Sequence, residues 1–239
     1  MKKLSASKGL IEDLVAASRI LADQQVLDAY GHVSARSDRR VDRFIMSRSL
    51  APALVTAKDL MELDTDSEPL PGDKRKGFIE RYIHGEIYRS RPEVMAVVHS
   101  HSPSVIPFGV ARTRLRAVYH MGSFLWSGAP VFDIRREREE NDLLVRDRPL
   151  GLALAKSLGK CTCVLMRGHG MTVVGDGVPE AVFRAIYTEM NARLQLQAMQ
   201  LEGPVEFLSD AEGRGSTAAN RGTIERPWEL WKKRALAKK

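Results

Sequence analysis

The chain places two histidines two residues apart at the end of a short apolar run. The run covers residues 95–98, and His99-Ser100-His101 follows it directly. A short continuous apolar run is consistent with a buried strand, and residues i and i+2 of a strand point to the same face. The pattern therefore predicts a strand over 94–101 that presents both imidazoles on one side, so the fold has to build a polar site at the end of a buried strand.

A third histidine, His169, lies between two glycines in Arg167-Gly168-His169-Gly170, a pattern typical of a tight turn. Three imidazoles at one point hold a divalent ion and leave a coordination position open, as catalytic metal sites do. The alternative for His99 and His101 is that both are core imidazoles with ordinary hydrogen bonds. The glycine-flanked His169 favours a metal site.

Glu80 and His84 lie four residues apart in a predicted helix over 78–89 and hence on one face of it. Because this helix immediately precedes the histidine strand, Glu80 can reach the same site as a ligand or as a general acid/base. Taken alone, Glu80 would be interpreted as a surface carboxylate paired with Arg81 or His84. We interpret His84 as a hydrogen-bonded residue that supports the site.

Helices and strands are expected to alternate along the chain. Helices are predicted over 8–30, 78–89, 139–158 and 179–201, and strands over 43–47, 60–64, 94–101, 115–120, 130–134, 162–166 and 171–174. Gly31 is expected to end the first helix and Pro149 to interrupt the third. The alternation indicates a layered α/β domain, and the short connection around His169 indicates that part of the sheet is antiparallel.

Bulk properties exclude several classes of protein. No apolar run is long enough to cross a bilayer and no signal-peptide core is present, so we expect a cytoplasmic protein without a membrane partner. The net charge is +7, but five of these charges come from lysines and one arginine within residues 232–239, so no nucleic-acid surface is expected. Cys161 and Cys163 are expected to be reduced thiols.

Five motifs together resemble the class II aldolase/adducin family over about residues 8–208. They are Gly31-His32-Val33-Ser34-Ala35-Arg36, Glu80-x-x-x-His84, Arg91-Pro92-Glu93-Val94, Val97-Val98-His99-Ser100-His101 and Gly168-His169-Gly170. Each motif is weak alone, but all five in the same order and spacing are specific. The resemblance implies a three-layer α/β/α sandwich around a mostly antiparallel sheet, assembled as a homotetramer with active sites between subunits.

The resemblance also implies roles for individual residues. His99, His101 and His169 would bind one divalent ion per subunit, and Glu80 would serve as a further ligand or as the acid/base. Imidazole and carboxylate ligands suit both zinc and manganese. Residues 1–208 would form the catalytic domain, followed by a polar and basic tail over 209–239.

The chain departs from the sugar-phosphate aldolases of this family where they bind phosphate. His32 replaces an asparagine, Arg48-Ser49 stands in place of Thr-Gly, and Phe78-Ile79 replaces Ser-Ser. Arg48 suits a carboxylate through two parallel hydrogen bonds, and an apolar face from Phe78 and Ile79 suits an aromatic ring. We expect Arg48, Ser49, His32 and Phe78 to bind substrate. Without the resemblance, Arg48 would be interpreted as an exposed loop arginine.

Two further positions differ from the family pattern. His120 stands where the aldolases carry a proton-donating tyrosine; an imidazole can also donate a proton near neutral pH, although a core histidine at a strand end is the alternative. Family members often complete a neighbouring site with a C-terminal aromatic, commonly tyrosine. No tyrosine follows Tyr187 here, so Trp228 or Trp231 would have to substitute, unless both simply pack the tail.

These departures look more like a decarboxylase branch of the family, whose members act on hydroxylated aromatic dicarboxylates such as 3-hydroxy-2-methylpyridine-4,5-dicarboxylate or 3,4-dihydroxyphthalate. We therefore expect a metal-dependent carbon–carbon lyase that decarboxylates a small aromatic carboxylate in aromatic catabolism, with Glu80 or His120 delivering the proton. The alternatives are an aldolase that cleaves a hydroxy-ketone or a sugar-phosphate-like substrate, and a non-catalytic, adducin-like interaction module. The intact set of three histidines and Glu80 argues against the second alternative.

Overall fold

The computed structural model describes residues 4–237, and its centre is a seven-stranded mixed sheet. Its strands are β1 (His32–Arg36), β2 (Arg43–Ser47), β3 (Leu60–Asp64), β4 (Ala96–Ser100), β5 (Val131–Phe132), β6 (Cys163–Met166) and β7 (Gly170–Gly175). They follow one another in the order β3-β2-β1-β4-β7-β6-β5. Every neighbouring pair is antiparallel except β5 and β6, which are parallel.

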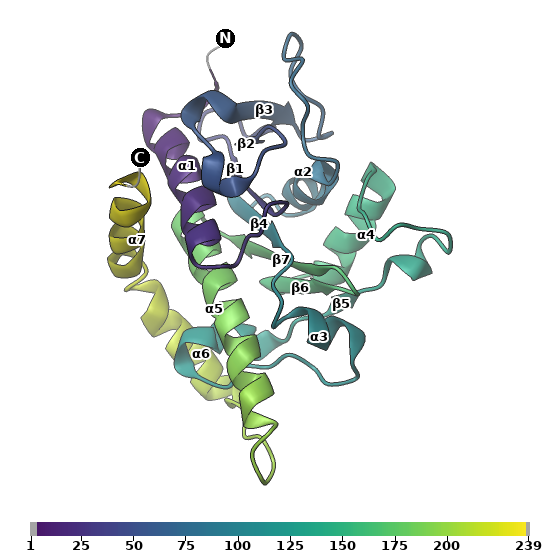
Figure 1. Cartoon of the computed structure of the whole chain (residues 1–239), viewed down its shortest axis with the longest axis vertical. Coiled ribbons are helices and arrows are strands. Elements are labelled where there is room, and N and C mark those ends of the chain that lie inside the picture. The colour runs from purple at the N-terminus through teal and green to yellow at the C-terminus, as the bar shows by residue number, and fades with distance from the viewer. Residues whose placement is uncertain (1–3, 238–239) are drawn as a thin grey trace.

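Helices cover both faces of the sheet, which gives three layers (Figure 1). The α-helices are α1 (Lys8–Asp23), α2 (Arg81–Ser90), α3 (Ile106–Val110), α4 (Arg148–Leu158), α5 (Val178–Ala198), α6 (Asp210–Arg221) and α7 (Glu225–Ala237). Helices α1 and α5 pack with one buried apolar cluster, and α2 and α4 pack with the other. The expected three-layer α/β/α architecture with a mostly antiparallel sheet is confirmed.

Strand β4 lies in the middle of the sheet, and its side chains alternate between the two cores. Ala96 and Val98 join the α1/α5 core, whereas Val97 joins the α2/α4 core, and all three are fully buried. A central strand buried on both faces needs apolar residues at every position. This is why the run before His99 is continuous, and it places that histidine at the heart of the molecule.

Short polar signals set the helix starts. The Ser7 hydroxyl accepts a hydrogen bond from the Leu10 amide at the start of α1, and the Asp147 carboxylate accepts one from the Leu150 amide at the start of α4. Such caps satisfy amides that have no partner within the helix. Pro149 lies in the first turn of α4, where its missing N–H costs nothing.

The strands predicted over 43–47 and 60–64 are confirmed as β2 and β3, and the histidine strand is confirmed as β4. Strand β1 was not predicted as a strand, although its residues belong to the first motif. It pairs with β4 so that His32 lies opposite His99. The histidines of two separate motifs are therefore neighbours across the sheet.

The first helix is shorter than predicted. It ends at Asp23 rather than near residue 30, and Gln25 takes a left-handed backbone conformation with φ 58° just after it. The expectation that Gly31 ends this helix was wrong. A Cβ at Gly31 would collide with the Leu27 side chain and lie 3.0 Å from the His99 carbonyl oxygen, so glycine is needed for close packing beside the site.

No strand forms over residues 115–120, contrary to the prediction. Two amide side chains from α5 bond this extended segment: Asn191 accepts from the Val118 amide at 3.0 Å and Gln195 accepts from the Arg116 amide at 2.9 Å. They supply the hydrogen bonds that a neighbouring strand would otherwise provide. The segment leads into a 3₁₀ helix over His120–Ser127.

The helix predicted over 139–158 was wrong in its first half. Helix α4 begins at Arg148, and Pro149 starts it rather than interrupting it. The preceding loop turns through Leu143, which has φ 67°, a conformation uncommon for residues other than glycine. The loop returns to the turn between β6 and β7, where the Leu143 carbonyl accepts a hydrogen bond from His169.

Helices α6 and α7 cover residues 210–221 and 225–237, so most of the polar and basic segment is helical. Trp228 is buried against the α1/α5 core and partly buried Trp231 packs on the same cluster, so these two tryptophans anchor the segment. Cys161 and Cys163 are free thiols, as expected. Among residues 4–237, no helix is long and apolar enough to cross a membrane.

Replacing Gly170 with alanine should destabilise the protein, because the new Cβ would collide with the Ser100 carbonyl oxygen across the β4–β7 pair. We expect the free energy of unfolding to fall by about 1–3 kcal/mol, measured by urea denaturation. The matched control is Gly215→Ala, at a helix position with open space around it. This variant should have a free energy of unfolding about 1 kcal/mol higher than wild type. Equal stability of the two variants would contradict the described approach of β4 and β7.

Candidate metal centre

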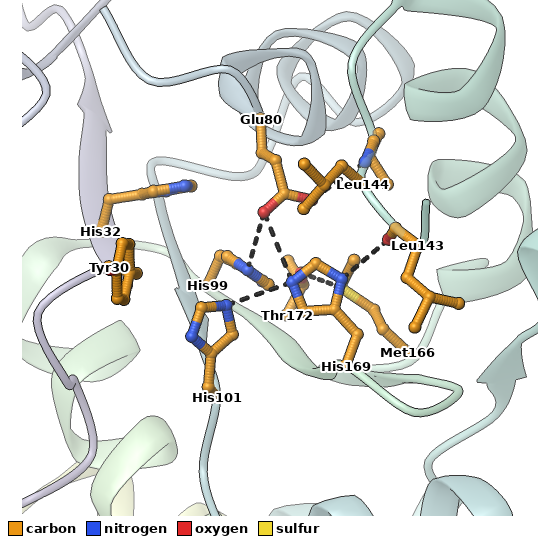
Figure 2. A network of polar contacts seen from close by, with 12 residues as sticks. Tyr30, His32, Glu80, His99, His101, Leu143, Leu144, Met166, His169 and Thr172 are labelled. Carbon is orange, nitrogen blue, oxygen red and sulfur yellow. Dashed lines mark hydrogen bonds and ion pairs between the residues drawn. The ribbon is translucent and has the colours of Figure 1, made fainter. Parts of the chain in front are cut away.

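One glutamate and three histidines from distant parts of the chain meet at a single point (Figure 2). The residues are Glu80, His99, His101 and His169, and each offers one ligand atom such that these atoms all lie within 4.8 Å of one another. His99 is fully buried, whereas the His101 side chain is about one quarter exposed. The cluster therefore has a buried end and an end that solvent reaches.

The elements of the fold account for this convergence. His99 is the fourth residue of β4, and His101 follows directly after the strand ends. His169 lies in the tight turn between β6 and β7, and the antiparallel pairing of β7 with β4 returns this turn to the end of β4. Glu80 is the residue that precedes the first turn of α2.

The three imidazoles share one arrangement: Nδ1 contacts an oxygen acceptor, and Nε2 is directed into the cluster. The Nδ1 contacts are His99 with the Met171 carbonyl at 3.1 Å, His101 with the Asp28 carboxylate at 3.0 Å and His169 with the Leu143 carbonyl at 2.9 Å. A carbonyl or ionised carboxylate only accepts, so each Nδ1 carries the hydrogen. In a neutral ring, Nε2 is then left with a lone pair that points into the cluster.

Glu80 completes the cluster with one oxygen and is held by the other. Its Oε1 accepts a hydrogen bond from the Val145 amide at 2.9 Å. Its Oε2 lies 3.4 Å from Nε2 of His99 and 3.4 Å from Nε2 of His169. The carboxylate is therefore oriented by the loop before α4 and directs one free oxygen toward the imidazoles.

This donor set fits a divalent metal ion. The His99 Nε2 atom is buried and has no hydrogen-bond partner within residues 4–237, and the Nε2 atoms of His101 and His169 are 3.1 Å apart. Buried nitrogens without partners are costly, and two lone pairs facing each other repel. A cation bound by three imidazoles and a carboxylate would remove both costs, and hydrogen bonds on the far side of the rings are what metal-ligating histidines normally have.

The charges of the cluster are coupled. Burial raises the pKa of the Glu80 carboxyl, but the charges of His99 and His169, whose Nε2 atoms lie 3.4 Å from Oε2, outweigh burial and hold that pKa well below its usual range. Burial lowers the pKa of His99, whereas the hydrogen bond and charge of Glu80 outweigh burial and raise the pKa of His169. Without an ion, these directions favour an ionised Glu80 beside a protonated His169, and metal binding would displace that proton.

Two of the residues predicted to bind substrate lie beside this cluster. The His32 ring is 5.1 Å from the His99 ring, and the Phe78 ring is 4.5 Å from the His32 ring. Both side chains are buried, whereas the neighbouring Ile79 is about half exposed. The structure brings His32 and Phe78 together beside the cluster.

Arg48 and Ser49 lie in the loop after β2. The Ser49 amide donates to the Lys76 carbonyl at 2.8 Å, which joins this loop to the segment that leads to Phe78. Arg48 donates from Nε to the Asp59 carboxylate at 2.8 Å and is more than one third exposed. No hydrogen bond of its Nη atoms is found within the described residues, so the terminal nitrogens remain open to a ligand.

His120 does not join the cluster within one chain. It is exposed at the start of the 3₁₀ helix, its carbonyl accepts a hydrogen bond from Asn220, and its ring contacts Tyr119. None of these contacts leads to Glu80 or to the three clustered histidines. A role for His120 in catalysis therefore requires a second copy of the chain.

Sequence reasoning missed several residues that shape the site. Asp28 orients His101 through one carboxylate oxygen, and its other oxygen accepts from the amides of Tyr30 and Gly31. Tyr30 is highly exposed, and its ring lies 6.5 Å from the His101 ring. The position of Asp28 three residues before the first motif was the available signal. The contribution of Leu143 and Val145 had no comparable signal, because it depends on where a loop folds back.

The comparison with known proteins identifies the family of this chain. The family described as "Class II Aldolase and Adducin N-terminal domain" matches residues 12–196. The chain belongs to this family. It is 40% identical to Decarboxylase tropJ of Talaromyces stipitatus over 244 residues, which cover 92% of each protein.

Two further comparisons support the same relationship. A 3,4-dihydroxyphthalate decarboxylase from Terrabacter sp. is 34% identical over 81% of each chain. The fold is similar to an L-fuculose 1-phosphate aldolase from Glaciozyma antarctica, with a TM-score of 0.77 over 95% of this chain and 88% of that chain at 21% identity. The family resemblance inferred from the motifs, and its kinship with decarboxylases, are confirmed.

Replacing His99 with alanine should remove bound metal, because it deletes the most buried of the clustered Nε2 atoms. We expect wild-type protein to retain about one divalent ion per chain after dialysis and the variant to retain almost none, measured by elemental analysis. His120→Ala serves as the matched control and should keep its ion, because His120 lies outside the cluster. Equal metal content in wild type and His99→Ala would contradict metal binding at this cluster.

Proposed function

We propose that this protein is a metal-dependent carbon–carbon lyase that removes carbon dioxide from a hydroxylated aromatic carboxylate. The observation that carries the proposal is the convergence of three Nε2 atoms and one Glu80 oxygen at a single, partly open point. The similarity to two proteins named decarboxylases, over most of each chain, supports this reaction class.

His99, His101, His169 and Glu80 would hold one zinc or manganese ion. Imidazole and carboxylate suit either metal. When bound, the ion would act as a Lewis acid that stabilises the negative charge developing on the substrate as the carbon–carbon bond breaks. The remaining steps are tasks for side chains of this chain.

Decarboxylation of a hydroxylated ring requires one proton transfer to carbon. The bond from the ring to its carboxylate breaks, its electron pair returns to the ring, carbon dioxide leaves, and a proton bonds to the ring carbon. The Glu80 carboxylate, ionised because its pKa is depressed, can accept the phenolic proton and return it to that carbon. The phenolate that remains then takes a proton from water, which restores the phenol and balances the reaction.

The substrate would lie between the cluster and the aromatic residues beside it. Phe78 and the exposed ring of Tyr30 offer apolar surface for an aromatic ring. Arg48 and Ser49 would bind a second carboxylate, with Arg48 using nitrogens that Asp59 leaves free. Carbon dioxide is neutral, so its release into this apolar surrounding is favourable.

We propose a homotetramer in which each active site lies between two subunits. The exposure of His120 supports this arrangement, since only a second copy could bring that imidazole to a cluster as an alternative proton donor. The buried position of Trp228 makes it an unsuitable residue to reach a neighbouring site, whereas Trp231 is partly exposed.

Aldol cleavage is the second candidate, because it uses the same metal site. The fold similarity to an L-fuculose 1-phosphate aldolase favours it, but Phe78 and Ile79 offer no side-chain donors for a phosphate. A non-catalytic, adducin-like module is less well supported, because binding alone does not require four converging metal-ligand atoms. Carbon dioxide release, compared with aldehyde release, separates the two enzymatic candidates.

The metal-loaded protein should release carbon dioxide from 3,4-dihydroxyphthalate or a related hydroxylated ring acid, and stripping the metal should abolish this release. Glu80→Gln should keep most of its metal, because Gln can still accept from the Val145 amide, but should lose about 10²–10⁴-fold in kcat. The readout is carbon dioxide evolution across a panel of ring acids. Full activity of the metal-stripped protein would refute the proposal.

Arg48→Met should weaken binding of dicarboxylates in particular. A lost charge-assisted hydrogen bond of about 1.5–3 kcal/mol raises KM by roughly 10- to 100-fold for a dicarboxylate, whereas a monocarboxylate should be little affected. Steady-state kinetics with both substrates provides the test, and Arg40→Met, a surface arginine paired with Asp42, is the control. Equal effects on both substrates would exclude Arg48 from the site.

A further inference from the structure

A chain of hydrogen bonds runs from His32 into the core beneath the sheet. His32 Nδ1 is 2.7 Å from His84 Nε2, His84 Nδ1 is 2.6 Å from Ser34 Oγ, and Ser34 Oγ is 2.7 Å from the Tyr88 hydroxyl. All four side chains are buried. Since His32 and Ser34 lie on one face of β1, and His84 and Tyr88 are one turn apart on α2, two regular elements hold the chain in place.

The buried phenol sets the direction of this chain. Ser34 Oγ is the only hydrogen-bond partner of the Tyr88 hydroxyl among the described residues. The Tyr88 O–H therefore has one available acceptor, Ser34 Oγ. A buried donor without an acceptor is costly, so Tyr88 donates to Ser34.

The remaining donors follow from the first. Apart from Tyr88, the only hydrogen-bond partner of Ser34 Oγ among the described residues is Nδ1 of His84, so Ser34 donates its one proton there. His84 then carries its hydrogen on Nε2 and donates it to Nδ1 of His32. With Nδ1 acting as acceptor, His32 must carry its own hydrogen on Nε2.

This conclusion does not depend on the charge of either ring. If His84 carried both hydrogens, its Nε2–H would still donate to Nδ1 of His32. If His32 carried both hydrogens, its Nε2–H would still be present. In each case Nε2 of His32 is a donor.

The Nε2–H of His32 is available to a ligand. It has no hydrogen-bond partner within residues 4–237, yet it is not among the buried polar atoms without a partner, so it keeps contact with solvent. Its ring lies 4.5 Å from the Phe78 ring and 5.1 Å from the ring of the metal-ligand candidate His99. A fixed donor beside the cluster matches a substrate oxygen that accepts hydrogen bonds.

We propose that Tyr88, Ser34 and His84 are positioning residues that hold His32 as an Nε2–H donor to a carboxylate of the substrate. The inference rests on the proposed function for the identity of the ligand, but the direction of the hydrogen bonds rests on the protein alone. The relay formed by the hydrogen bonds of Tyr88, Ser34, His84 and His32 selects substrates that carry an acceptor opposite Nε2 of His32, because a pre-oriented donor loses little entropy on binding. It also excludes Nε2 of His32 as a general base.

The direction of the relay is tested by comparing two substitutions of His84 in the zinc-loaded protein. His84→Gln preserves the relay, because its carbonyl oxygen accepts from Ser34 while its amide donates to His32. In His84→Met, the methionine side chain has a similar length but can neither accept from Ser34 nor donate to His32. The hydrogen position on His32 is determined by ¹⁵N NMR of histidine-labelled protein, assigned with a His32→Gln sample.

We expect the Nε2–H form of His32 alone in wild type and in His84→Gln, and a mixture with the Nδ1–H form in His84→Met. A predominant Nδ1–H form in wild type overturns the proposal, and so does loss of the Nε2–H form in His84→Gln. These spectra need no substrate. The spectra of wild type and His84→Gln therefore test the hydrogen position on His32 even if His84→Met fails to fold.

The ligand is tested with phthalate, a ring dicarboxylate without a hydroxyl group, by calorimetry. Binding should be within about threefold of wild type in His84→Gln and about 10- to 100-fold weaker in His84→Met, with metal content unchanged in both. Unchanged phthalate affinity in a folded His84→Met protein would refute a carboxylate as the partner of His32. Absence of carbon dioxide release with the predicted NMR result would instead refute the proposed reaction and leave the relay intact.

Discussion

The site depends on hydrogen bonds behind the imidazoles more than on the imidazoles themselves. Each Nδ1 is held by an oxygen that can only accept, so the three Nε2 atoms face one another at a separation that favours a cation between them. Those oxygens come from β7, from the turn before β1 and from the loop before α4. The donor atoms can therefore be in place only when these three segments are folded.

The loop before α4 connects the metal cluster to the helical layer. Leu143 orients His169 through its carbonyl, and Val145 orients Glu80 through its amide, so one short segment sets the positions of two ligands. The unusual backbone of Leu143 is consistent with this task, since strained conformations persist where the surroundings hold them. Asp28 has a similar role on the other side, because it bonds both His101 and the turn at Tyr30.

Much of the fold was predictable where a pattern is local. The apolar run before His99 identified a central strand, and the sequence over 43–47 and 60–64 identified two more. One prediction failed because side chains replaced a backbone partner. Residues 115–120 have the composition of a strand, but Asn191 and Gln195 bond them instead, and no local pattern reveals an amide that arrives from a distant helix.

The sequence by itself determined the three histidine candidates, because residues two apart on a strand share a face and His169 lies in a glycine-flanked turn. It also determined the family, through motifs in a specific order. Only the tertiary structure decided which ring nitrogens face the site, where His120 lies, and which groups orient Glu80 and His32. Those properties depend on the direction of individual hydrogen bonds between segments far apart in the chain, and these exist only after the sheet and its two helical layers have closed around them.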